Sequence, residues 1–193
     1  DERSRYLLVE NRKVENYVDM ALYYARMDAV YKDYMIAETN LQEVAQQVLL
    51  QNKYYLIQSH VKAEVACPDT VYSDKKWIAF ILNQLIQNSV KYGRSEGTHI
   101  QIVTKKTKSG VLLRVKDDGI GIPKEELPRI FEKGFTGTNG RNRERSTGMG
   151  LYLCRKLCDK LNIEIRAESA EGKGTEIILM FPVSDYLTGY RET

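Results

Sequence analysis

The sequence predicts an α+β fold: a two-layer α/β sandwich, with helices on one face of a mixed sheet, preceded by one long helix. Two observations support this prediction. Residues 1–27 place apolar side chains at three- and four-residue steps without Gly or Pro, which is typical of an amphipathic helix. From residue 34 onward, helical stretches alternate with strand-like runs and hairpins. The length of 193 residues fits one medium domain plus a smaller element.

Composition narrows the class of protein. Hydrophobic residues make up 42% and charged residues 28% of the chain, so we expect a packed core rather than disorder. The net charge of +3 does not favour nucleic-acid binding. Cys67, Cys154 and Cys158 lack zinc-type spacing and are expected in the core. No apolar run could cross a bilayer and no signal peptide is visible. The chain starts at Asp1 rather than Met, so we expect it to belong to something longer.

The first half of the chain is expected to contribute helices and strands in turn. The expected elements are a helix over 1–27, a linker, a strand at 34–38, a helix at 41–53 and a strand at 56–67. Asn40 or Thr39 would cap the second helix. The second strand would hold a partly exposed His60, and Pro68 with Asp69 would then turn the chain.

The second half repeats this alternation. The expected elements are a helix at 74–92, strands at 99–107 and 110–118, a short helix at 127–135, a loop at 134–147, a helix at 148–161 and strands at 163–169 and 175–182. Ser73 or Asp74 would cap the first helix and Gly93 would end it. The last two strands would form a hairpin across Glu-Gly-Lys-Gly.

The apolar stripe of helix 1–27 needs a partner. The helix packs on its own domain, or it is half of a helical hairpin that dimerises. The pattern leaves both interpretations open.

Helix 74–92 carries a second, polar edge. At about 100° per residue, the core face comprises Ile78, Ile81, Leu82, Leu85, Ile86 and Ser89. The adjoining arc holds Gln84, Asn88, Lys91 and Tyr92. An Asn oxygen can bind Mg²⁺ and a Lys can bind phosphate. The alternative is a solvated polar flank.

Two further stretches are rich in glycine. The strand from Val111 ends at Asp117, before Gly119 and Gly121, where a carboxylate could accept a hydrogen bond from a ligand amine without obstruction. The alternative is an ordinary turn.

The second of these stretches precedes helix 148–161. Thr147, Gly148 and Gly150 stand where helical N–H groups can face a phosphate. The alternative is capping by Ser146 or Thr147. The loop before them is long enough to be a mobile lid. Its arginines would contact phosphate or form a solvated charged run: Arg141, Arg143 and Arg145.

Five motifs together resemble those of bacterial sensor histidine kinases. Asn-Gln-Leu-Ile-Gln-Asn-Ser-Val-Lys-Tyr resembles their N box, Asp-Asp-Gly-Ile-Gly-Ile-Pro the first glycine box, Ile-Phe-Glu-Lys-Gly-Phe the F box, Ser-Thr-Gly-Met-Gly-Leu the second glycine box and Gly-Lys-Gly-Thr the last glycine motif. Their order and spacing are similar to the Bergerat-type (GHKL) ATP-binding fold over residues 34–183. Helix 1–27 resembles the second helix of the dimerisation and phosphotransfer hairpin.

The resemblance implies a domain division and a set of partners. Residues 1–30 would be part of the hairpin, and residues 34–193 the catalytic ATP-binding domain. The partners would be ATP or ADP, a response regulator and, in the full-length protein, a second copy. The domain would lie on the cytoplasmic side of a bacterial membrane protein. Tyr-Val-Asp-Met-Ala-Leu-Tyr-Tyr-Ala-Arg and Phe-Glu-Lys-Gly-Phe-Thr-Gly-Thr-Asn-Gly-Arg more narrowly resemble kinases paired with peptide-antibiotic ABC exporters of Gram-positive bacteria.

The resemblance also implies roles for individual residues. Asp117 would accept the adenine amino hydrogen bond, and Asn88 would hold the Mg²⁺ that bridges the phosphates. Lys91 would contact phosphate, and Tyr92 ribose or base. The remaining contacts would come from Gly119 and Gly121 along the nucleotide, Thr147, Gly148 and Gly150 at the triphosphate under a lid over 134–147, and Ile122, Phe131 and Leu151 in the wall.

The implied reaction is transfer of the γ-phosphoryl group to a histidine, with Asn88, Gln84 and Lys91 as the catalytic residues. Two positions depart from the family pattern. His60 and His99 precede Val61 and Ile100 rather than an acidic residue, so we expect the acceptor histidine upstream of Asp1. Gln84 stands where related ATPases place a glutamate, and an amide cannot take a proton, so we expect very slow hydrolysis.

Two other classes of function remain open. One is a different enzyme of this fold: an anti-sigma serine kinase, or a chaperone- or gyrase-type ATPase. The other is a nucleotide-sensing module without transfer activity.

Overall fold

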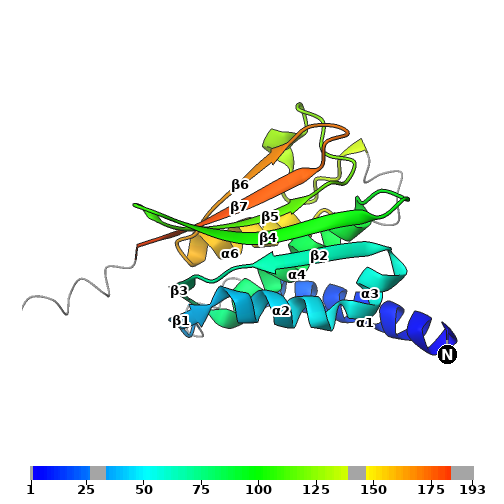
Figure 1. The fold of residues 1–193 in the computed structure, drawn as a ribbon, viewed down its shortest axis with the longest axis horizontal. Helices are drawn as coiled ribbons and strands as arrows, with labels where there is room; N and C mark the ends of the chain where they lie inside the picture. The colour runs from blue at the N-terminus through cyan, green and yellow to red at the C-terminus, as the bar shows by residue number, and fades with distance from the viewer. Residues whose placement is uncertain (1, 27–33, 139–146, 184–193) are drawn as a thin grey trace, which may run out of the picture.

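The computed structural model describes residues 2–26, 34–138 and 147–183. Its elements are α1 (Glu2–Arg26), β1 (Ala37–Asn40), α2 (Leu41–Gln51), α3 (Lys53–Gln58), β2 (Val61–Ala66), β3 (Thr70–Ser73), α4 (Lys75–Lys91), β4 (Thr98–Thr107), β5 (Gly110–Asp117), η2 (Leu127–Arg129), α6 (Gly150–Lys160), β6 (Glu164–Ser169) and β7 (Thr175–Pro182). Figure 1 shows the strands of the main sheet above the helices α1 and α2.

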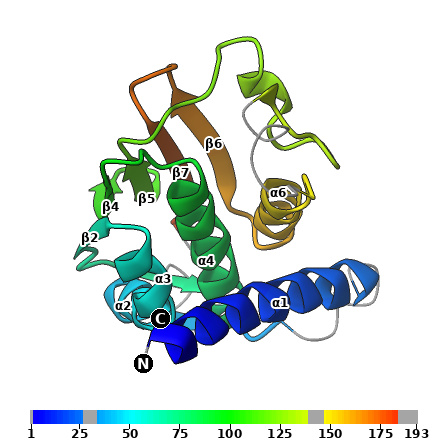
Figure 2. The same ribbon diagram turned by 90° about the vertical axis from the view of Figure 1, so that its right-hand side faces the viewer.

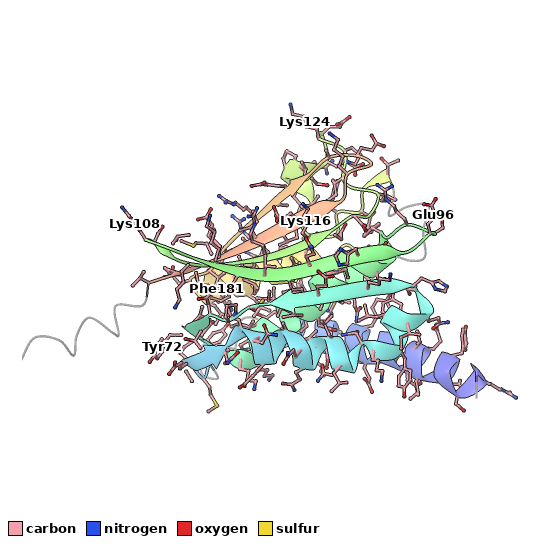
Figure 3. The ribbon with its side chains drawn as sticks, viewed as in Figure 1. Tyr72, Glu96, Lys108, Lys116, Lys124 and Phe181 are labelled. Carbon is pink, nitrogen blue, oxygen red and sulfur yellow. The ribbon has the colours of Figure 1, made fainter. Side chains whose placement is uncertain are left out.

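The main sheet is mixed, as predicted. Its strand order is β2-β4-β5-β7-β6, and β1 and β3 form a separate two-stranded sheet. β2 pairs with β4 in parallel, whereas the other pairs are antiparallel. Glu96 and Lys108 mark opposite ends of β4 in Figure 3, and the candidate site lies at the Glu96 end.

The core lies between the sheet and helices α2, α4 and α6, which cover one face. Figure 2 shows α4 and α6 on the same side of the sheet, with α1 crossing beyond them. Alternate strand residues such as Ile100 and Leu113 are fully buried against this layer. The predicted core face of α4 is confirmed, since all of its members are buried: Ile78, Ile81, Leu82, Leu85, Ile86 and Ser89.

Two predicted helix caps are confirmed. The Asn40 side chain accepts a hydrogen bond from the Glu43 amide at the start of α2. Asp74 accepts from the amides of Lys76 and Trp77 at the start of α4. Each side chain satisfies helical N–H groups that would otherwise lack a partner.

The sequence placed the first strand and the end of the second helix wrongly. The strand expected at 34–38 is β1, three residues later, and the helix expected over 41–53 divides at Asn52 into α2 and α3. The Asn52 side chain donates to the Val48 carbonyl and to Asn83 Oδ1, so tertiary contacts fix the break. α3 occupies the first part of the strand predicted at 56–67.

His60 is therefore not a strand residue. It lies between α3 and β2 with φ of +53°, a left-handed conformation that turns the chain into the sheet. Its side chain is exposed.

Three later elements also differ from expectation. Residues 70–73, for which the sequence predicted no strand, form β3 and pair with β1. The helix predicted at 127–135 is only the single turn η2, with Pro128 at its start. α6 begins at Gly150 rather than Gly148, because Gly148 has φ of +65°, which no right-handed helix contains.

α1 packs on the rest of the chain through a few side chains. Val9 and Tyr23 are buried, and Tyr23 contacts the rings of Trp77 and Phe80 at centroid distances of 4.6 and 5.5 Å. Other large apolar side chains of α1 remain exposed: Tyr6, Leu7, Leu8, Val14, Val18 and Leu22. The helix thus packs on its own domain and still presents an unused apolar surface. The linker predicted after Met27 falls in residues 27–33, outside the described ranges.

Cys67, Cys154 and Cys158 are buried in the core, as predicted. Burial raises the pKa of the Cys67 thiol to about 11 and that of Cys158 to about 12, so these thiols are unreactive near neutral pH. In the described part of the chain, no helix combines the length and apolar character that crossing a bilayer requires.

Candidate functional site

One cleft brings together the three stretches singled out in the sequence. It lies among α4, the end of β5 with the turn that follows it, and the segment leading into α6. The predicted site residues that line it are Gln84, Asn88, Lys91, Tyr92, Asp117, Gly121, Ile122, Thr147, Gly148, Gly150 and Leu151. Two predicted residues, Gly119 and Phe131, are not part of the lining.

Asp117 is the cleft's carboxylate, and three donors hold it in place. Its Oδ1 accepts from the amides of Gly119 at 2.9 Å and Thr175 at 3.1 Å, and its Oδ2 accepts from Ser89 Oγ at 2.8 Å. Burial raises the pKa of Asp117, whereas these three hydrogen bonds act in the opposite direction. The carboxylate is thus fixed in orientation with an edge toward the cleft.

The glycines after Asp117 are required by neighbouring backbone. A Cβ at Gly121, where φ is +71°, would lie 2.0 Å from the Ala170 carbonyl oxygen. A Cβ at Gly119 would lie 2.6 Å from the Tyr92 carbonyl oxygen. The sequence predicts that both glycines let a ligand approach the turn, and that prediction stands untested. The structure adds a second reason for them, because the turn packs against the 170–174 turn and the end of α4.

The polar edge of α4 faces the cleft. Gln84 is only 6% exposed, and its Nε2 has no hydrogen-bond partner among the described residues. Its Oε1 lies where a Cβ on Gly150 would approach to 2.9 Å, so the glycine brings α6 against this amide. Asn88 is half-buried in the lining. The interpretation of this edge as a solvated flank is therefore wrong.

The start of α6 opens into the same cleft. Among the described residues, no side chain caps the helix. Thr147 Oγ1 accepts a hydrogen bond from the amide of Met149, just before the helix, at 3.3 Å. Gly148 packs on Gly134, whose amide donates to the Gly148 carbonyl at 3.0 Å. Free N–H groups at a helix start favour an anion. The capping alternative is not observed for Thr147.

Other cleft residues escaped the sequence argument. Ser89 was assigned to the core, although a hydroxyl on an otherwise apolar face was a usable signal. Phe135, rather than Phe131, lines the cleft; Phe131 packs against the core beneath Arg155. Tyr17 and Met20 of α1 and Tyr55 of α3 also border it, and no local pattern announces such long-range contacts. The predicted phosphate-contacting arginines and Ser146 fall in 139–146, outside the described residues.

The cleft suits a cation only together with a ligand. Among the described residues no cluster of three His, Cys, Asp or Glu side chains could hold a metal. Asn88 supplies one amide oxygen, so Mg²⁺ bound there would need oxygens from a bound phosphate group and water. Neither His60 nor His99 lines the cleft; His99 Nε2 lies 3.3 Å from Glu64 Oε1.

Comparison with known proteins places this geometry in a family. Residues 73–185 match the family described as histidine kinase-, DNA gyrase B- and HSP90-like ATPase. The chain is 34% identical to sensor histidine kinase YxdK of Bacillus subtilis over 89% of its length, and 36% identical to sensor protein kinase GraS of Staphylococcus aureus over 95%. It spans 54% and 53% of those relatives, about half of each.

A solved structure agrees with the fold. The catalytic domain of histidine kinase ThkA superposes with a TM-score of 0.66 at 26% identity, covering 77% of this chain and 97% of that domain. ThkA in complex with the response regulator protein TrrA matches with a TM-score of 0.68 at 21% identity, covering 94% of this chain and 52% of that one. From the cleft, the fold and these matches, the chain belongs to the family of histidine kinase-, DNA gyrase B- and HSP90-like ATPases, on the branch of the bacterial sensor histidine kinases.

Proposed function

We propose that this chain is the catalytic part of a two-component sensor histidine kinase, which binds ATP and transfers its γ-phosphoryl group to a histidine. The observation that carries the proposal is the convergence of Asp117, Asn88 and the start of α6 on one cleft. A carboxylate, an amide oxygen and helical N–H groups match, respectively, the base, the metal and the phosphates of a nucleotide.

The base would bind at Asp117. Its carboxylate accepts hydrogen bonds and cannot donate while ionised, so it suits the 6-amino group of adenine. The apolar side chains of Val115, Ile122 and Ile177 line the same cleft and would pack against the rings. At this end the lining comes from β5 and β7, through Val115, Asp117, Thr175 and Ile177.

The triphosphate would lie between α4 and α6. Asn88 would hold Mg²⁺, which supplies charge neutralisation for the transferring phosphoryl group. Lys91 would add a positive charge, and the amides at Gly150 and Leu151 would face phosphate oxygens. The protein's contribution is then to orient the nucleotide and stabilise charge, since such transfers need little covalent help.

The acceptor would come from outside the cleft. His60 is exposed before β2 and His99 stands beside Glu64, so neither reaches the phosphate position. We propose an acceptor histidine on a preceding helix that pairs with α1, with residues 1–30 as the second helix of a dimerising hairpin. The apolar side chains left exposed on α1 support that pairing.

The phosphoryl group would then pass to the receiver domain of a response regulator, the kind of partner that ThkA has in its solved complex. Attachment to a bacterial membrane, with this domain on the cytoplasmic side, and pairing with a peptide-antibiotic exporter stay predictions from the resemblance.

Calorimetry tests the binding proposal. ATP and ADP should bind in the presence of Mg²⁺, and removal of Mg²⁺ should weaken ATP binding far less in Asn88→Ala than in the wild type, because the variant lacks the metal-holding oxygen. Binding of ATP that is independent of both Mg²⁺ and Asn88 would remove the metal from the proposal.

A longer protein tests the transfer. With the segment upstream of Asp1 restored, incubation with labelled ATP should yield acid-labile, base-stable phosphate on a histidine of that segment. Phosphate on His60 or His99 would contradict the proposed acceptor, and ATP binding without any labelled product would favour a nucleotide-sensing module.

A further inference from the structure

Ser89 is a polar residue on the core face of α4. It is 5% exposed, among side chains that are otherwise apolar. Its hydroxyl donates to Asp117 Oδ2 at 2.8 Å, across 28 residues of sequence. If Ser89 served only to fill space, an alanine would pack there equally well. The hydrogen bond to Asp117 therefore indicates a role in the cleft.

The hydrogen bonds to Asp117 leave little acceptor capacity unused. An ionised carboxylate offers about four acceptor positions. The Gly119 and Thr175 amides take the two on Oδ1, and Ser89 takes one on Oδ2. One position on Oδ2 remains, and Asp117 lines the cleft together with Ser89 and Thr175, so a bound ligand can occupy that position.

We propose that Ser89 is a positioning residue that keeps Asp117 an ionised acceptor with one position free, and thereby makes the cleft select 6-amino purines over 6-oxo purines. The inference rests on the proposed nucleotide binding and deepens it. Two of the three donors are backbone amides, which every substitution except proline retains. Ser89 donates through its side chain, so a substitution at this position can remove the hydrogen bond.

Burial and hydrogen bonding act in opposite directions on the protonation of Asp117. Burial favours the neutral acid, and a hydrogen bond donated to the charged form opposes this. Without the Ser89 hydroxyl, protonation becomes easier. A protonated Asp117 donates instead of accepting, which suits a 6-oxo group and disfavours a 6-amino group.

Other charged groups surround the pair and are common to wild type and variant. Asp118, next in the chain, raises the pKa of Asp117. On the α4 side, Lys91 and Tyr92 line the cleft. The Arg94 guanidinium donates to the Asp118 carbonyl at 2.7 Å and to the Gly172 carbonyl. On β7, the group that meets Asp117 is the Thr175 amide, which does not titrate.

The test compares ATP with inosine triphosphate, which differs only in carrying a 6-oxo group and a proton on N1. Both affinities are measured by calorimetry at roughly pH 7.5 and roughly pH 6, for wild type and Ser89→Ala. Because the phosphates are the same, their titration cancels in the ratio of the two affinities. The wild type should prefer ATP at both pH values.

In Ser89→Ala, the preference for ATP should fall by about tenfold at the lower pH and by less at the higher pH. Ser73→Ala is the matched control: Ser73 is also buried, at 1% exposure, but its hydroxyl has no hydrogen-bond partner among the described residues and lies away from the cleft. It should keep the wild-type ratio. Ser89→Thr, which retains a hydroxyl, should restore the pH-independent preference.

The outcomes distinguish failure of nucleotide binding from failure of the role assigned to Ser89. If the wild type binds neither nucleotide, the proposed function itself fails. If the wild type prefers ATP and Ser89→Ala has the wild-type ratio of ATP to inosine triphosphate affinity at both pH values, Ser89 does not position the acceptor. An equal loss for both nucleotides would make Ser89 a packing residue and would also overturn the inference.

Discussion

Asp117 carries its charge in surroundings where burial acts against it. Three donors from three different elements offset that penalty. An acid with a raised pKa retains its proton to higher pH in the folded protein than in the unfolded chain. Asp117 therefore contributes stability that is lost as pH rises through the window between its ordinary and raised pKa values.

Asp117→Asn separates binding from stability. The asparagine can accept from the Gly119 and Thr175 amides and donate to Ser89 Oγ, so the fold keeps its hydrogen bonds. It presents a donor to the adenine amino group, however, and should weaken ATP binding by about 1–3 kcal/mol. The free energy of unfolding at neutral pH should equal or exceed that of wild type, because the buried charge is gone. Calorimetry and urea unfolding measure the two quantities, and unchanged affinity would remove the adenine assignment.

Gln84 sets the expected rate of ATP hydrolysis. Its amide lies against Gly150 and cannot accept a proton from water. We therefore expect the wild type to release phosphate very slowly when no histidine acceptor is present. Gln84→Glu restores a group that can act as a base and should increase this rate, whereas Gln84→Leu should not. Phosphate release is measured in a coupled assay, and wild-type turnover comparable to that of a true ATPase would refute the assignment.

Among the elements, two turns behave as one unit. The turn after β5 and the turn between β6 and β7 meet backbone to backbone: the Gly172 amide donates to the Ile120 carbonyl at 2.7 Å, and a Cβ at Gly174 would lie 2.0 Å from the Asp117 carbonyl oxygen. Arg94 binds carbonyl groups of both turns. The position of Asp117 therefore depends on a hairpin more than fifty residues away in sequence.

Two glycine substitutions test this packing. Gly121→Ala would push a methyl group into the Ala170 carbonyl, whereas Gly172→Ala meets open space at a similar φ of +75°. Gly172→Ala should cost only backbone strain, about 1 kcal/mol. Gly121→Ala should cost at least about 2 kcal/mol more. Urea unfolding of both variants measures the difference, and equal losses would show that strain alone matters at Gly121.

Local patterns predicted the elements whose contacts are regular. The apolar arc of α4, its Asp74 cap and the hairpins of the sheet follow from the spacing of side chains, and the structure confirms them. The division at Asn52 and the strand β3 escaped prediction because partners distant in sequence decide them: Asn83 for the first and β1 for the second.

The cleft shows the same limit. The polar arc of α4 could be read from helical spacing, and Asp117 from the glycines that follow it. The donors to Asp117 could not be derived in this way, because the Ser89 and Thr175 contacts exist only once α4, β5 and β7 are assembled. Glycines that serve the packing of two turns look, in a sequence, like glycines that serve a ligand.

At the scale of the whole molecule, Tyr23 secures α1. Its ring lies 4.6 Å from the Trp77 ring and 5.5 Å from the Phe80 ring, and burial raises the pKa of its hydroxyl. Tyr24 adds an exposed contact, since it accepts a hydrogen bond from Lys133. Val9, closer to the N-terminal end of α1, is also buried, so contacts at both ends of the helix attach it to the domain.

Tyr23→Ala should detach this helix. Loss of a buried aromatic side chain costs about 3–5 kcal/mol, and the remaining contacts of α1 are few. Hydrogen exchange of the α1 amides should become much faster while that of β5 and β7 is retained. Tyr23→Phe keeps the ring and should leave exchange close to wild type. Uniformly faster exchange throughout the sheet in Tyr23→Ala would show instead that α1 and the domain unfold together.

The attachment of α1 also affects the cleft, because Tyr17 and Met20 of this helix line the same cleft as Asn88. If a bound nucleotide changes the free energy with which α1 packs on the domain, then displacing α1 must change the free energy of nucleotide binding by the same amount. A mechanical input delivered along one helix would then be converted into occupancy of the cleft without a separate relay.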